Sequence, residues 1–237
     1  MAGFFLAFTG YRLSNSQVFS PAKIKWITKV NPRGQRSKIM LPDSTIVYLG
    51  AGSRLRFPES FARELREISL SGEAFFEVKK NPNKPFIVHA GEIQTRVLGT
   101  SFKIEAFTGS PFSVQVSTGK VRVSRKTPGR VKALAVLLPG DRLCVSDAEV
   151  TKSKISTEDV LGWKDAKLNF NNYSLEDITG ILGRWYDLRV TFKHKAKSSQ
   201  RLSLILDANR SADKVFDLLA SAAHFRYSIK NKEIFIY

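Results

Sequence analysis

Between residues 21 and 150, apolar positions alternate with polar ones at the two-residue period of a β-strand. The clearest case is 112–124, where such alternation continues on both sides of a turn at Thr118-Gly119. Four more units of two short runs and a Gly- or Pro-containing turn lie at 37–49, 67–78, 86–98 and 134–145. The pattern predicts an all-β N-terminal domain over residues 21–150, built as a β-sandwich or as an irregular β-solenoid.

The period changes after a polar stretch at residues 151–165, which we interpret as a linker. Apolar residues then recur at helical spacing after Ser174, which is a favoured N-cap residue. Strand-like runs precede and follow this helix at 167–170 and 188–192. The residues that would share the apolar helix face are Leu175, Ile178, Ile181, Leu182 and Trp185.

The same strand, helix and strand pattern returns 37 residues later. The corresponding pairs are Ser174 and Ser211, Ile178 and Val215, Leu182 and Leu219, and Arg189 and Arg226. A final strand, 233–237, follows the repeat. We therefore predict that residues 166–237 form a small α+β domain of duplicated βαβ units with a C-terminal hairpin.

Residues 1–20 form an apolar terminus, with the uncharged run Gly3–Tyr11 at its centre. A membrane-spanning helix needs about 20 apolar residues, so this run is half a span. It could be the remnant of a transmembrane helix that starts upstream, or an apolar terminus packed against the first domain. The sequence leaves both interpretations open.

The chain is strongly basic, because 38 Lys and Arg residues outnumber 21 Asp and Glu residues and give 237 residues a net charge of +17. Such charge lies on the surface and favours anionic partners. An electrostatic binder of an anionic polymer, either nucleic acid or acidic glycan, is therefore the alternative function. No nucleic-acid-binding motif supports nucleic acid as the partner, and we do not expect it. An anionic membrane surface is a further candidate partner.

Catalysis and cofactor binding find no support in the sequence. Glu73 and Glu77 would share a strand face, but four residues at ~3.3 Å each place them about 13 Å apart, beyond the roughly 5–9.5 Å of glycosidase pairs. Neither phosphate-loop motif is present, and the single cysteine and three histidines lack metal-ligand spacing. We predict a protein that is not an enzyme, with no cofactor, no metal site and no catalytic residue.

Recognition by a partner protein remains, through the edge of a small sheet or an exposed aromatic residue. The C-terminal strand is our candidate edge, with residues Glu233, Ile234, Phe235, Ile236 and Tyr237. Tyr186 at the end of the first helix is the candidate aromatic anchor. Its neighbour Trp185 has the helical spacing of a core residue.

Five motifs occur in order in the β region: RGQRSKIMLPDSTIVYLGAGSRLRFP, LREISLSGEAFFEV, PFIVHAGEIQTRVLGTSFKIEAF, VQVSTGKVRVS and LLPGDRL. With this ordered series the β region resembles the FecR family of periplasmic regulators of extracytoplasmic-function sigma factors. The duplicated C-terminal domain looks like the STN type, the short N-terminal domain of secretins and TonB-dependent receptors. Ser44 and Gly50 depart from the family's usual Gly and Asn.

The resemblance implies a periplasmic signal-transduction module of a sigma-factor regulator that is anchored in the inner membrane. It also implies that this module binds the signalling domain of an outer-membrane TonB-dependent transducer. We expect contact with a sigma factor only through a cytoplasmic segment outside this chain.

Overall fold

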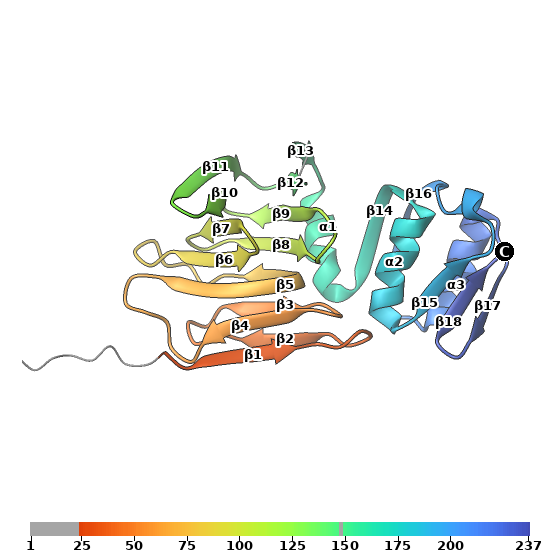
Figure 1. Ribbon diagram of the computed structural model, residues 1–237, viewed down its shortest axis with the longest axis horizontal. Helices are drawn as coiled ribbons and strands as arrows, with labels where there is room; N and C mark the ends of the chain where they lie inside the picture. Colours follow the sequence, from red (N-terminus) through yellow and green to blue (C-terminus); the bar gives the residue numbers. More distant parts are fainter. Residues whose placement is uncertain (1–23, 147–148) are drawn as a thin grey trace, which may run out of the picture.

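The computed structural model describes residues 24–146 and 149–237. The predicted apolar terminus, 1–20, lies outside the described residues, so both interpretations of it stay predictions. The chain forms a β unit followed by a smaller α+β unit, and the two lie side by side (Figure 1). The predicted fold class, all-β followed by α+β, is confirmed.

The β unit has two sheet layers that share the long strand β5 (Arg66–Glu77). Sheet A has the order β1-β4-β5-β6-β7-β10-β11, and sheet B has the order β2-β3-β5-β8-β9-β12-β13. The other strands are β1 (Trp26–Val30), β2 (Ser37–Met40), β3 (Ile46–Leu49), β4 (Arg54–Pro58), β6 (Phe86–Ala90), β7 (Ile93–Val97), β8 (Ser101–Ala106), β9 (Phe112–Thr118), β10 (Val121–Thr127), β11 (Arg130–Leu137), β12 (Asp141–Val145) and β13 (Val150–Lys154). Of the two architectures that the sequence left open, the structure has the sandwich.

The alternation in the sequence explains this sandwich, because every second side chain points into one core. Leu55 and Ile68 from sheet A meet Leu49 and Phe76 from sheet B, and all four are fully buried. The outer faces differ. Outward residues of sheet A such as Arg96 are exposed, whereas the outward residues of sheet B are largely covered by the C-terminal part of the chain.

The residues predicted as a linker, 151–165, are instead ordered structure. Most of them belong to edge strand β13, to the short helix α1 (Thr157–Gly162) and to the 3₁₀ turn η1 (Trp163–Asp165). The polar composition misled the prediction, because β13 is an exposed edge strand in which residues 151–154 are all polar and show no alternation. Ser156 accepts a hydrogen bond from the Glu158 N–H and begins α1.

The C-terminal unit encloses two helices between two small sheets. Strand β14 (Lys167–Ser174) pairs antiparallel with β16 (Arg201–Asp207), and β18 (Glu233–Ile236) pairs parallel with β15 (Arg189–Phe192) and antiparallel with β17 (Tyr227–Lys230). The helices are α2 (Leu175–Tyr186) and α3 (Ala212–Ala223), with a 3₁₀ turn η2 (Lys195–Lys197) between the repeats.

The order of strand, helix and strand is present twice, but the repeats are not βαβ units in the strict sense. The strands on either side of each helix lie in different sheets. The physical reason is that the first strands of the two repeats pair with each other, so each helix links one sheet to the other. Side chains from both sheets and both helices form the core of this unit, including Phe170, Leu182, Leu219 and Ile234.

Candidate functional site at the junction of the two units

The loop after β1 docks on the C-terminal end of α2. Arg33 donates a hydrogen bond from Nη2 to the carbonyl oxygen of Leu188 (2.9 Å), and the Gly34 N–H donates to the carbonyl oxygen of Arg184 (2.8 Å). Gly34 has φ of +79°, and a Cβ there would lie 3.0 Å from the Cβ of Asp187. The left-handed backbone and the close approach both favour glycine at this contact.

Aromatic residues from both units meet behind this loop. Trp163 from η1 and Trp185 from α2 pack edge to face, with ring centroids 5.9 Å apart. The guanidinium of Arg36, in the β1–β2 loop, lies 4.0 Å from the centroid of the Trp185 ring. Phe75 points outward from sheet B and is fully buried in the hydrophobic core of the C-terminal unit. The two units therefore share one packed core.

Three charged side chains are enclosed on sheet B beneath Trp163. Glu73 on β5 and Glu105 on β8 lie directly opposite each other, and like charges in that position repel. Lys103 offsets the repulsion, because its Nζ forms an ion pair with Glu105 and lies 3.7 Å from Oε2 of Glu73. The ammonium group also lies 5.0 Å from the centroid of the Trp163 ring.

Burial and ion pairing set the pKa values of this cluster. Burial raises the pKa of Glu73, although Lys103 opposes the shift. Burial alone would also raise the pKa of Glu105, but Lys103 holds it below its usual range. Burial disfavours the Lys103 ammonium, yet the two carboxylates raise its net pKa. The lysine therefore stays charged and is the group that makes this buried arrangement stable.

Glu77, which shares β5 with Glu73, has a separate role. Its carboxylate accepts a hydrogen bond from Nζ of Lys164 in η1 (2.7 Å), and the Tyr48 hydroxyl lies 3.5 Å away. The contact adds an ion pair between β5 and η1 at the junction. Glu73 and Glu77 thus each bind a lysine.

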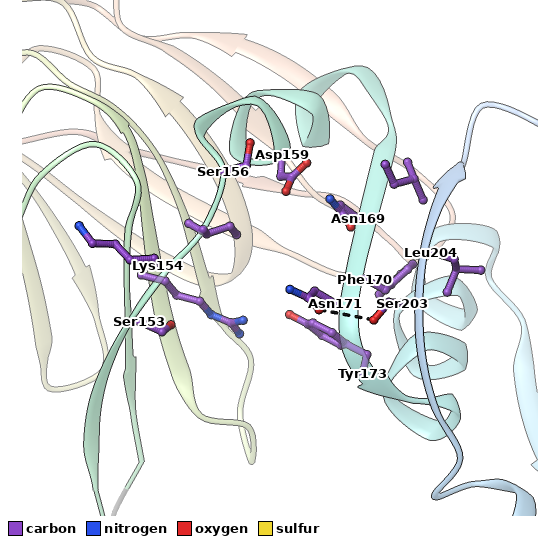
Figure 2. A pocket seen from close by; sticks show the side chains of 13 residues that line it. Ser153, Lys154, Ser156, Asp159, Asn169, Phe170, Asn171, Tyr173, Ser203 and Leu204 are labelled. Atoms are coloured by element: carbon purple, nitrogen blue, oxygen red, sulfur yellow. Dashed lines mark hydrogen bonds between the residues drawn. The ribbon is translucent and has the colours of Figure 1, made fainter.

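A cleft of about 720 Å³ opens beside the junction, between strands β12 and β13 on one side and β14 and β16 on the other (Figure 2). Polar and apolar atoms contribute about equally to its lining. The outward side chains of β14 and β16 form one wall, where Ser203 Oγ donates to the Asn171 amide oxygen (3.4 Å) next to Asn169. Ile205 in the same wall is 66% exposed.

Cations form the opposite wall of the cleft. Arg142 and Lys154 line it, and Asp159 from α1 is the carboxylate among the described lining residues. Lys154 also forms an ion pair with Asp141, which does not line the cleft (2.8 Å). Nε of Arg142 is buried and has no hydrogen-bond partner among the described residues. Amides, hydroxyls and the Arg142 and Lys154 cations beside an exposed isoleucine are groups that can bind a polypeptide segment with polar or acidic side chains.

The structure contradicts the predicted edge strand. β18 is the central strand of its sheet, paired on both sides, so its backbone cannot accept a further strand. Ile234 and Ile236 are buried in the core. The prediction failed because the last strand of a chain often lies at an edge, whereas here it lies between β15 and β17. The five residues 233–237 do not form an open edge.

Tyr186 is not an exposed anchor either. It is half-buried, and its hydroxyl lies 3.2 Å from the carbonyl oxygen of Ala208 and 2.9 Å from that of Arg210, donating to these acceptors. Burial, with the nearby Asp207 carboxylate, raises its pKa to about 12. The placement of Trp185 in the core is confirmed.

None of the helices in residues 24–146 and 149–237 is both long and apolar enough to cross a membrane.

Comparisons with known proteins agree with the motif order. The family described as "FecR protein" matches residues 28–122, and the family described as "FecR, C-terminal" matches residues 167–236. Together these matches cover most of the chain and both structural units. The second match covers the C-terminal unit and assigns it to the C-terminal region of FecR proteins. The likeness of this unit to the STN type stays a prediction. A search of curated proteins gives no match.

Two solved structures share the whole architecture. Both are crystal structures of a candidate anti-sigma factor from Parabacteroides distasonis ATCC 8503, at 1.65 and 2.50 Å resolution. Each is 28% identical to this chain with a TM-score of 0.79. The alignments cover 89% and 90% of this chain, and 98% and 99% of the respective solved chains. With two family matches in the expected order and this likeness over nearly the full length, the chain belongs to the FecR family of signal-transduction regulators.

Proposed function

We propose that this chain is the periplasmic module of a FecR-type regulator and binds the signalling domain of an outer-membrane TonB-dependent transducer. Family membership supports a regulatory role. The observation that best supports partner binding is the cleft, because its two walls come from different units. A segment bound there touches the β unit and the C-terminal unit at the same time.

Strands with one unpaired edge border this cleft, among them β13 and β16. Among the described residues, β16 is paired only with β14, and β13 is paired only with β12. Each therefore has one edge with free backbone groups, which a partner strand can extend. β16 and β13 replace the C-terminal strand as the proposed recognition edges.

The packed junction supports a mechanism for passing on the signal. Since Phe75, Trp163 and Trp185 belong to one core, a partner that shifts one unit also strains the other. Binding would favour the arrangement of the two units that fits the partner best, which is a population shift.

The experiment uses calorimetry to measure binding of the full chain to the purified signalling domain of a TonB-dependent transducer from the same organism. We compare the wild type with Ile205→Asn in the cleft and with Ile229→Asn on β17, whose side chain is 43% exposed. Burial of an isoleucine stabilises a complex by roughly 1.5–3 kcal/mol, so Ile205→Asn should weaken binding about 10- to 150-fold. Ile229→Asn should bind like the wild type.

Point variants are preferable to deletion of the C-terminal unit. Deletion would expose Phe75 and the buried charges of sheet B, so lost binding could reflect misfolding. The proposal fails if the wild type does not bind the signalling domain. If only Ile229→Asn weakens binding, the cleft is not the interface.

A further inference from the structure

The outer face of sheet A is the large sheet face that the C-terminal unit leaves uncovered. The register places its outward residues in rows across the strands. One row runs through Glu67, Ile87, Arg96, Arg122 and Val136, and the next through Arg56, Ser69, His89, Gln94 and Ser124. Arg54 and Arg56 alternate along β4 with buried residues. Cations are thus spread over the face from β4 to β10.

These arginines lack acidic partners within the sheet. Arg96 and Arg122 lie directly opposite each other, and neither forms an ion pair or a side-chain hydrogen bond with any described residue. Glu67 is the carboxylate of these rows, and it lies 3.4 Å from His89. Two facing arginines repel each other unless an anion lies between them or above them. The face therefore selects a negatively charged partner.

A pocket of about 470 Å³ lies beside Arg96 and Arg122. Arg96, Arg122 and Lys120 supply its charges, Pro82 and Leu98 supply apolar walls, and none of the described residues that line it is a carboxylate. Two further exposed aliphatic residues, Val136 and Leu138, lie on the adjoining strand β11 and just after it. Cations beside exposed aliphatic side chains match phosphate headgroups above the start of the acyl chains.

The opposite edge of the same sheet contains the point where the chain enters from residues 1–23. Trp26 on β1 is 39% exposed and lies under the Arg56 guanidinium, 4.5 Å from its ring centroid. Tryptophan and arginine together are favoured at membrane–water interfaces. The preceding residues include the apolar run Gly3–Tyr11. Sheet A therefore contains the described strand that lies nearest in sequence to this apolar run.

We propose that the outer face of sheet A docks on the surface of a bilayer that contains anionic phospholipids. The charge, the interspersed aliphatic residues and the entry of the chain at β1 all fit this partner. The cleft between the units lies on the side of sheet B, so the membrane and a partner protein can bind at the same time. The inference is independent of the proposed transducer binding.

The first experiment measures co-sedimentation of the full chain with phosphatidylcholine vesicles, with and without phosphatidylglycerol. We compare Arg96→Gln/Arg122→Gln with Arg210→Gln/Arg226→Gln, a control pair that removes the same charge from exposed positions of the C-terminal unit. Each basic residue near an anionic surface contributes about 1 kcal/mol. The sheet A pair should lower partitioning into anionic vesicles roughly thirtyfold, and the control pair less than threefold.

A second measurement reports whether sheet A faces the lipid. It stays informative if residues 1–20 hold every variant on the vesicle and partitioning does not change. Trp26 is the exposed tryptophan, while Trp163 and Trp185 are buried at the junction. Brominated acyl chains should therefore quench Trp26 emission in anionic vesicles, and Trp26→Phe should remove the quenching. Arg96→Gln/Arg122→Gln should reduce it.

Either of two results overturns the proposal. Equal loss of partitioning in both double variants would show a general effect of net charge. Absence of lipid quenching, with Arg96→Gln/Arg122→Gln weakening a complex with an acidic protein instead, would assign the face to a protein partner.

Discussion

Replacing Lys103 by methionine tests the buried charge cluster at the junction. Lys103 is the cation within ion-pair distance of both Glu73 and Glu105 among residues 24–146 and 149–237. Methionine keeps much of the side-chain volume but leaves the buried carboxylate of Glu73 facing the partly buried carboxylate of Glu105. Removing one partner of a buried ion pair costs about 3–5 kcal/mol. Since a domain is stable by only about 5–15 kcal/mol, this is a large fraction of the total.

The pH dependence of this loss follows from the pKa values. Without Lys103, the pKa values of Glu73 and Glu105 should both lie above that of an unfolded glutamate, about 4.3. Such a group destabilises the folded state increasingly as the pH rises from its unfolded pKa toward its folded one. The free energy of unfolding of Lys103→Met should therefore fall furthest behind the wild type at neutral pH and recover partly near pH 5.

The assay is urea unfolding followed by tryptophan emission at about pH 5 and about pH 7.5. The control is Lys25→Met, which breaks an exposed ion pair with Glu59 (3.1 Å) and should cost less than about 1 kcal/mol. Equal losses in the two variants would refute the reasoning. A loss in Lys103→Met that does not change with pH would refute the assignment to the two carboxylates.

Two further predictions concern stability. Trp163→Ala removes the indole that packs on Trp185, and we expect a loss of about 3–5 kcal/mol in urea unfolding, whereas a loss below about 1 kcal/mol would contradict a shared core. Asp141 is buried and accepts hydrogen bonds from Lys152 and Lys154 (2.8 Å each), which hold its pKa far below its usual range. Asp141→Asn should therefore cost about 1.5–3 kcal/mol at neutral pH, and its deficit should shrink as the pH falls below about 4, where the wild type progressively loses this contribution. A deficit that is constant down to about pH 2 would argue against the ionised carboxylate as its source.

The sequence predicted the β unit well because alternation reports burial on one face of a strand. It could not predict that sheet B is covered on its outer face as well. Lys103 and Glu105 alternate with Phe102 and Ile104 as solvent-facing residues do, yet α1 and η1 lie over them. One signal was present: Ala74, Phe75 and Phe76 are consecutive apolar residues, which is typical of a strand buried on both faces.

The candidate site was missed for a related reason. The polar stretch that reads as a linker forms one side of the cleft through β13, and it places Trp163 at the junction. Composition reports only that these residues are polar. It does not report that the polar atoms of Ser153 and Asp159 point into a space between two units. Likewise, strand order is a long-range property, so nothing local in 233–237 indicated that β18 would lie between two other strands.

The burial of Phe75 by residues far along the chain affects how the protein is made. The β unit is synthesised first, and its outward Phe75 and Tyr48 belong to a core whose other members follow Val160. At roughly 5–20 residues per second, those residues appear on the order of 5–20 s later. During that interval the side chains of Phe75 and Tyr48 on the nascent sandwich lack the residues that cover them in the complete chain. Chaperone binding to this surface, or delayed folding of β5, would protect the chain until α1 and α2 arrive.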